Sequence, residues 1–297
     1  MTRLTSADVR PLESSLVAHD QHLTAVTGLD LAGLALEAAD LPADAAHRKG
    51  LADLEMAVVP ITGGLGLIGG FARSVAAILN QIGCRSFVTL AADVAGIAEA
   101  VAQGPTALFM SDDRDFFALD PSHRTSVHNT PATAEGFVAG LAGMAGGLEG
   151  KQVLLLGCGP LGGQAAEALL DRGARLTLVD RIPERCVVLR EGLMSRDAPQ
   201  ARIQVMGENP PRGAELIFDA TNTGDHIDVE MIGKRTLVAA PGMPCGITAA
   251  ARRTLGNRLL HDPLQIGVAT MAAKIYAARV KKAQISDCCD DEEGTRG

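Results

Sequence analysis

The sequence predicts an α/β protein built from two α/β units in tandem, with helices at both ends. Short apolar runs alternate with longer helical stretches in two successive series, which is the pattern of parallel strands joined by crossover helices. A GxGxxG turn follows the first strand of each series. Helical patterns precede the first series and follow the second.

The first unit begins with a helical region of about fifty residues. Thr5 with Asp8 gives a capping box, and apolar residues recur behind it at helical spacing, although Pro11 either kinks this helix or lies nearer its start. From Met56 the pattern changes to short apolar runs bounded by glycine. It predicts strands MAVVPI, SFVTL and TALFM, with helices around 71–82 and 94–102 between them.

The second unit begins after the glycine-bearing segment 143–150. Its predicted strands are VLLLG, RLTLVD, ARIQVM, LIFDAT and RTLVAA. After Pro263 a helical pattern over 264–283 is expected to pack back across the first unit.

These patterns suggest four segments. Residues 1–130 form a helical and α/β substrate or catalytic domain, and residues 131–262 form the second α/β domain. Residues 263–283 form the returning helix. Residues 284–297 are expected to be a disordered acidic tail, because DCCDDEEGTRG has nothing to bury.

Composition excludes several classes of function. The 35 Asp and Glu against 27 Lys and Arg give a net charge of −8, which disfavours a nucleic-acid partner. Seven Phe, one Tyr and no Trp leave few stacking platforms. No apolar run approaches the roughly 18 residues that span a bilayer, and the polar first residues do not resemble a signal peptide, so we expect a cytoplasmic protein.

The cysteines and histidines do not predict a metal site. Six cysteines are scattered without a CxxC pair, which favours free thiols in a reducing compartment. His19 and His22 could share a helix face, but they lack a third ligand.

One of the two GxGxxG turns predicts a dinucleotide site. Such a site also needs an acidic side chain at the end of the next strand, where it binds the adenosine ribose hydroxyls. Asp180 ends the strand that follows the second turn, whereas the strand after the first turn, 64–69, ends in Leu90 and Ala91. The second unit is therefore predicted to be a Rossmann-like NAD-binding domain. Its turn consists of Gly157, Cys158, Gly159, Pro160, Leu161 and Gly162.

The acid at the ribose end favours NAD over NADP. Asp180 would repel a 2′-phosphate, although the neighbouring Arg181 keeps NADP open as an alternative.

Two features of the first unit suggest a substrate site. The first glycine turn, within 62–70, is free to anchor a carboxylate, or it serves only close helix packing. The acidic run 111–115 follows the strand TALFM, where parallel sheets place their ligands, so Asp112 and Asp113 could handle a proton or hold an ammonium group. A solvated turn is the alternative. His123 and His128, in a predicted loop, could also do acid–base work.

Taken together, the motifs resemble those of the PylD family, the dehydrogenases of pyrrolysine biosynthesis that form the pyrroline ring. The resemblance runs from LTSADV through the final helix with little gapping. It rests on VPITGGLGLIGGF, DVAGIAEAV, MSDDRDF, HNTPAT, LLLGCGPLGGQAAEALL, APGMPCGI and DPLQIGVATM. Gly63 and Leu65 stand where other members tend to have polar side chains.

The resemblance implies NAD-dependent oxidation of the terminal primary amine of L-lysine-Nε-3R-methyl-D-ornithine, with loss of ammonia and closure to pyrrolysine. It places Asp112 at the reacting end of the substrate, with Thr62, Phe71, Asp113 and Asn129 around it. The second glycine turn and Asp180 would hold NAD. The residues near the nicotinamide would be Thr221, Pro241 and Gly242.

Two other functions remain open. One is another two-domain NAD(P) dehydrogenase of the amino-acid or methylenetetrahydrofolate type, although Lys49 is the only lysine in the first 150 residues and a shikimate-type Lys–Asp pair is hard to build. The other is a non-catalytic NAD sensor, which would need Asp180 but not Asp112. An exposed apolar helix face is compatible with a homodimer.

Overall fold

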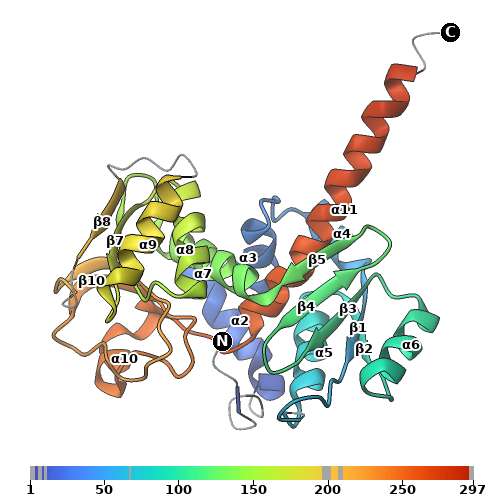
Figure 1. Cartoon of the computed structure of the whole chain (residues 1–297), viewed down its shortest axis with the longest axis horizontal. Coiled ribbons are helices and arrows are strands. Elements are labelled where there is room, and N and C mark those ends of the chain that lie inside the picture. Colours follow the sequence, from blue (N-terminus) through green and yellow to red (C-terminus); the bar gives the residue numbers. More distant parts are fainter. Residues whose placement is uncertain are drawn as a thin grey trace.

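The protein forms two α/β units, each around its own sheet (Figure 1). The computed structural model describes residues 4–5, 9, 12–66, 68–195, 202–206 and 210–293. The first sheet has the strand order β2-β1-β3-β4-β5 and the second has the order β11-β10-β9-β6-β7-β8. This arrangement confirms the predicted tandem α/β fold.

The first sheet begins with the three predicted strands. β2, β1 and β3 pair in parallel, and α5 and α6 connect them as expected. The elements are β1 (Glu55–Val59), α5 (Phe71–Gln81), β2 (Arg85–Val88), α6 (Asp93–Gln103) and β3 (Ala107–Ser111).

An antiparallel hairpin that the sequence did not predict completes this sheet. β4 (Phe116–Asp120) and β5 (Thr125–His128) follow β3 directly, so the acidic run lies in a β3–β4 hairpin turn and not before a crossover helix. β4 does alternate between buried and half-buried positions, but its third buried side chain is Asp120. The hairpin was missed because this carboxylate, paired with Arg279 at 2.7 Å, interrupts the apolar alternation.

The second sheet is parallel throughout and confirms the predicted Rossmann-like unit. β6 lies at its centre between β7 and β9, and four of its five residues are buried. Such strands read as continuous apolar runs, which is why the sequence located them. The elements are β6 (Gln152–Leu156), α8 (Pro160–Asp171), β7 (Arg175–Val179), α9 (Pro183–Met194), β8 (Ile203–Val205), β9 (Ala214–Asp219), β10 (Ile232–Ala239), α10 (Ala249–Leu255), η2 (Gly256–Arg258) and β11 (Leu259–Leu260).

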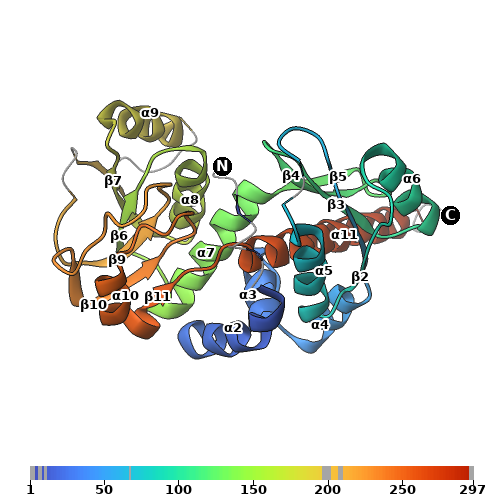
Figure 2. The same cartoon turned by 90° about the horizontal axis from the view of Figure 1, so that it is seen from below.

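Helices from both ends of the chain lie beside one central helix. The N-terminal region is helical as expected, in α2 (Leu12–Thr27), α3 (Leu31–Ala38) and α4 (Ala45–Ala52). Asp8, the second residue of the predicted capping box, lies outside the described residues. The helix α7 (Asn129–Ala145) was not predicted; it runs between the two sheets (Figure 2).

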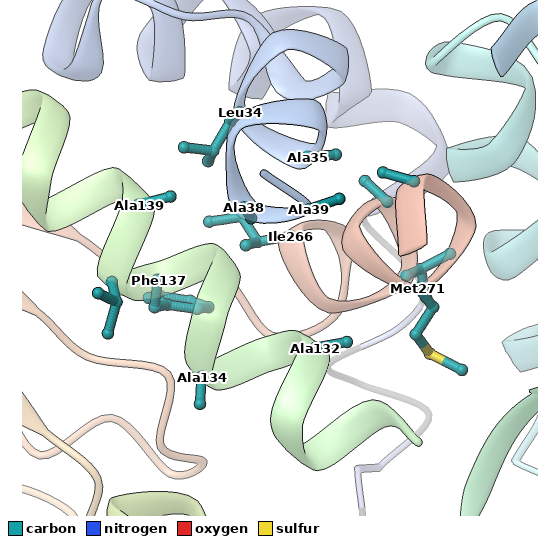
Figure 3. Close-up of a cluster of buried hydrophobic side chains, with 14 of the residues drawn as sticks. Leu34, Ala35, Ala38, Ala39, Ala132, Ala134, Phe137, Ala139, Ile266 and Met271 are labelled. Atoms are coloured by element: carbon teal, nitrogen blue, oxygen red, sulfur yellow. The ribbon is translucent and has the colours of Figure 1, made fainter. Parts of the chain in front are cut away.

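The core between α3, α7 and α11 is built largely from small side chains. Figure 3 shows Ala38 of α3 and Ala139 of α7 in the space between these two helices, with Ile266 of α11 beside them. A Cβ at Gly136 of α7 would lie 2.5 Å from Ile266 Cγ2, so glycine is needed for this close approach of α7 and α11. The labelled side chains are each less than a tenth exposed. Their close packing fixes the relative positions of the three helices.

The last helix is longer than predicted. α11 (Gln265–Glu293) contacts α7, α3 and α5, which confirms that it packs back on the first unit. The helix continues through residues 284–293, where the sequence predicted a disordered tail. Figure 1 shows this part of α11 projecting beyond both sheets. Residues 294–297 lie outside the described part of the chain.

Among the residues described, no helix is both long and apolar enough to cross a membrane.

Candidate active site

One cleft of about 730 Å³ brings the two units together. The carboxyl ends of β3 in the first sheet and of β6, β7 and β9 in the second all point to it, as expected for ligand sites in parallel sheets. The predicted residues that line it are Phe71, Asp112, Asp113, Asn129, Gly157, Gly159, Pro160, Leu161, Asp180, Arg181, Thr221, Pro241 and Gly242.

The second glycine turn joins β6 to α8 in the form that a dinucleotide site needs. Gly157 has φ +88°, a left-handed conformation that favours glycine, and its N–H donates to Val179 O at 2.8 Å. A Cβ at Gly162 would lie 1.9 Å from Gly157 O, so α8 packs directly on the turn. No side chain caps α8, whose amino end lies beside the cleft.

The residues present fit a dinucleotide. A Cβ at Gly159 would meet no protein atom within 4 Å, although this residue lines the cleft. The bare backbone therefore leaves room beside the helix amino end for an anionic group such as a pyrophosphate.

Gly159→Ala is expected to weaken NAD binding by about tenfold or more, because the methyl group would occupy this room and force the pyrophosphate outward. The unfolding temperature should not fall, since the added atom meets no protein atom. Calorimetric titration with NAD and thermal unfolding measure the two effects. Gly192→Ala, at an exposed position of α9, also adds a methyl group without a neighbour and should leave NAD affinity unchanged. Wild-type affinity in Gly159→Ala would contradict this placement.

Asp180 lies where the sequence placed it, at the end of β7. Its Oδ2 accepts the N–H of Cys158 at 2.8 Å and its Oδ1 accepts the N–H of Ile182 at 2.8 Å, so the carboxylate is fixed against the glycine turn. Arg181 lines the cleft beside it, and so does Arg185 from the first turn of α9.

Cys158 and Gly162 belong to the turn but do not line the cleft. The sulfur of Cys158 lies 3.3 Å from that of Cys186 in α9, and burial raises the pKa of both thiols. All four cysteines whose side chains are described are free. Within the described residues, no group of three or more His, Cys, Asp or Glu side chains could hold a metal ion.

The first glycine turn is held by two carboxylates. Asp93 accepts hydrogen bonds from both the amide and the hydroxyl of Thr62, and Asp113 Oδ2 accepts the N–H of Leu65 at 2.6 Å. Thr62 was expected in the substrate pocket, but it does not line the cleft, because its polar atoms are directed to α6 instead. Of the described residues in 62–70, Ile68 alone lines the cleft.

Asp112 shapes the hairpin turn and stays ionised. Its Oδ1 accepts the N–H of Asp115 at 2.8 Å and that of Arg114 at 2.7 Å. These two backbone hydrogen bonds lower the pKa of the Asp112 carboxyl. The side chain is therefore an exposed carboxylate on the wall of the cleft, suited to holding a cation.

Asn129 begins α7 at the floor of the cleft. Its Oδ1 accepts the hydroxyl hydrogen of Thr133 at 3.3 Å. The preceding His128 pairs with Asp115 at 3.2 Å and accepts the N–H of Thr130, so it ends β5 and caps α7 rather than lying in a loop. Neither His128 nor His123 lines the cleft.

The comparisons with known proteins agree with this architecture. The chain matches the family described as "Pyrrolysine biosynthesis protein PylD, N-terminal domain" over residues 8–127. It is 30% identical to the pyrrolysine synthase of Methanosarcina barkeri over 271 residues, which cover 91% of this chain and 97% of the relative. The chain belongs to the pyrrolysine synthase family. The pyrrolysine synthase of Methanosarcina acetivorans is 29% identical over 275 residues, 93% of this chain and 100% of that protein.

Solved structures share the fold of this pyrrolysine synthase family member at low identity. Shikimate dehydrogenase in complex with NADP+ gives a TM-score of 0.53 at 11% identity, over 76% of this chain and 90% of that one. Quinate dehydrogenase from Corynebacterium glutamicum in complex with NAD gives 0.50 at 16% identity, over 78% and 99%. They support the two-unit α/β fold.

The cleft also contains residues that the sequence did not single out. His226 lines it, and the buried Asp219 lies behind His226 at the end of β9. The sequence could have pointed to Asp219, because this residue ends the strand LIFD much as Asp180 follows the strand RLTLV. No comparable signal marks His226, because it comes from a loop. Asp262 lines the cleft too; its carboxylate accepts three backbone N–H groups and caps α11.

Proposed function

We propose that this protein catalyses NAD-dependent oxidation of the terminal primary amine of L-lysine-Nε-3R-methyl-D-ornithine, with release of ammonia and ring closure to pyrrolysine. It would thus be an amine dehydrogenase. Membership of the pyrrolysine synthase family supports a role in pyrrolysine biosynthesis, because the match covers almost the whole length of both chains. The cofactor and the reaction rest on the cleft.

The proposal rests on one observation: the two walls of the cleft present different chemical groups. The wall from the second unit has a bare glycine turn, an uncapped helix amino end and Asp180. The wall from the first unit has the ionised Asp112. A dinucleotide fits the first wall and a primary ammonium group fits the second, so an amine and its oxidant would meet between them.

The second unit would contact NAD along the whole length of the cofactor. The backbone of Gly157–Gly162 and the first turn of α8 bind the pyrophosphate, and Asp180 still has lone pairs to accept the ribose hydroxyls. Thr221, Pro241 and Gly242 surround the other end. Bound NAD supplies a hydride acceptor for the carbon that carries the amine.

The first unit would orient the substrate. Asp112 binds the ammonium group by a charge-assisted hydrogen bond and holds it against the wall formed by Phe71 and Asn129. Its low pKa makes Asp112 a strong anchor but a weak acceptor for the proton that the amine must lose. Asp113 lines the cleft as well, but one of its oxygens already accepts the N–H of Leu65, so its role is to hold the glycine turn.

A coupled assay tests the proposal. The protein is incubated with NAD and lysine-methylornithine, the absorbance of the reduced cofactor is followed, and mass spectrometry detects the substrate's loss of ammonia and two hydrogens. Turnover is expected with NAD and much less with NADP, because Asp180 repels a 2′-phosphate. Shikimate, quinate and methylenetetrahydrofolate serve as rival substrates. Turnover of one of these alone would reassign the enzyme, and NAD binding without any turnover would indicate a sensor.

A further inference from the structure

A fully buried carboxylate lies at the end of β9, next to the cleft. The side chain of Asp219 has no exposed surface, and its Oδ1 accepts the hydroxyl hydrogen of Thr221 at 2.8 Å and the N–H of Thr221 at 3.1 Å. Its Oδ2 has no hydrogen-bond partner among the described residues. Burying an ionised carboxylate in this way is costly unless a positive charge compensates it.

His226 is the group that can supply this charge. Its Nε2 lies 3.4 Å from Asp219 Oδ1, and 28% of its side chain is exposed, on the wall of the cleft. Its Nδ1 lies 2.8 Å from the carbonyl oxygen of Thr223, which can only accept, so Nδ1 carries a hydrogen whether the ring is neutral or charged. Nε2 is therefore the nitrogen that gains and loses the proton.

The surroundings favour the charged ring. Burial lowers the pKa of His226, but the carboxylate of Asp219 and the carbonyl of Thr223 outweigh it, and the pKa is raised above the ordinary 6.5. Cys245, in the loop after β10, also raises the pKa of His226, and the Cys245 thiol is itself hydrogen-bonded to His261. His226 is thus a stronger base than an isolated imidazole, whereas the pKa of Asp112 is lowered.

Thr221 connects this pair to the ligand space. Its hydroxyl oxygen lies 3.4 Å from His226 Nε2, and the residue lines the cleft as part of the predicted nicotinamide end. In this arrangement the hydroxyl hydrogen is donated to Asp219 Oδ1. A hydroxyl turns about its C–O bond and has two lone pairs, so it can direct this hydrogen to His226 Nε2 while it receives a proton from the cleft.

We propose that His226, paired with the buried Asp219, accepts the proton that the substrate ammonium loses before oxidation, and that the Thr221 hydroxyl relays it. An N–H bond of R–CH2–NH3+ breaks, an O–H bond forms on Thr221 as its own O–H bond breaks, and an N–H bond forms at His226 Nε2. The products are R–CH2–NH2, with its lone pair free, and an imidazolium facing Asp219. This inference rests on the proposed function for the identity of the amine.

The first test measures the imidazole without any turnover. We expect the 13Cε1 resonance of His226 in the full-length protein to titrate above the pKa of a free histidine, and Asp219→Asn to move that titration to lower pH. His47 and Asp44 form a comparable pair on the surface, so Asp44→Asn is the control and should leave the His226 titration unchanged. A His226 titration that does not respond to Asp219→Asn overturns the pairing, provided that the variant melts as the wild type does.

The second test is the pH dependence of kcat/KM for formation of reduced cofactor. A general base works only when it is neutral, so wild-type activity should fall below the pKa of His226, and this acidic limb should move to lower pH in Asp219→Asn. His226→Gln should remove the limb and lower the rate at neutral pH by about 10²–10⁴-fold. Thr221→Val should lower the rate similarly while the His226 resonance still titrates. His47→Gln should match the wild type.

The outcomes separate the two proposals. If the wild type does not oxidise lysine-methylornithine, the proposed function fails, whatever the His226 titration shows. If the wild type is active and His226→Gln or Thr221→Val keeps the wild-type rate and pH profile, the relay is wrong while the proposed function stands.

Discussion

Asp112→Asn is expected to lower turnover of lysine-methylornithine by about 10²–10⁴-fold while NAD affinity stays at the wild-type value. The substitution removes the negative charge that holds the ammonium group. It should preserve the hairpin turn, because an asparagine oxygen can still accept the N–H groups of Arg114 and Asp115. The loss would therefore be in substrate positioning and not in folding. Steady-state kinetics, NAD titration and thermal unfolding measure the three quantities.

Asp44→Asn is the matched control for this experiment. Asp44 also accepts a backbone N–H, from His47, and that hydrogen bond, followed by the one from the His47 side chain, lowers its pKa, but it caps α4 outside the cleft. The control should be fully active. Wild-type turnover in Asp112→Asn would remove Asp112 from the reaction, and a large fall in its unfolding temperature would mean that the turn, not the charge, was lost.

Gly162→Ala is expected to abolish NAD binding and to destabilise the fold by about 1–3 kcal/mol. The new methyl group would lie 1.9 Å from the carbonyl oxygen of Gly157 and 2.9 Å from its carbon. Both belong to backbone, so the glycine turn and α8 must separate. Because this separation moves the helix amino end away from the turn, the pyrophosphate loses its binding site. Calorimetric titration and thermal unfolding report the two effects.

The next residue provides a close control. Gly163 lies in the same turn of α8, but a Cβ there would be 3.8 Å from Leu189, an ordinary contact. Gly163→Ala should bind NAD normally and gain about 0.5–1 kcal/mol of stability, because alanine is the better helix former. Equal behaviour of the two variants would show that close packing of α8 on the turn is not required.

The second unit was easier to predict from the sequence than the first. Its strands are buried on both faces and appear as uninterrupted apolar runs, and its glycine turn and Asp180 are close in sequence. In the first unit the hairpin after β3 was missed because Asp120 occupies a buried position that apolar periodicity assigns to a hydrophobe. The extent of α11 was not predicted, because its acidic last residues show no apolar periodicity.

Sequence reasoning found residues that are near their partners along the chain and missed those that the fold assembles. Asp112 and Asn129 were located by their family motifs and do line the cleft. Thr62 does not line the cleft, because it binds Asp93 at the start of a different helix, and no local pattern links the two. His226 acquires its role from Asp219 and Thr221, whose relation to it depends on how the loop after β9 folds back.

The position of α7 has a consequence for attempts to dissect the molecule. This helix packs on α3 and α11 on one side and on α8 and β10 on the other, and its buried side chains share one core cluster with residues of both sheets. A fragment cut before or within α7 would expose apolar surface on whichever half it left behind. The two halves are therefore expected to unfold together, and truncated versions would be poor substitutes for the intact chain in binding studies.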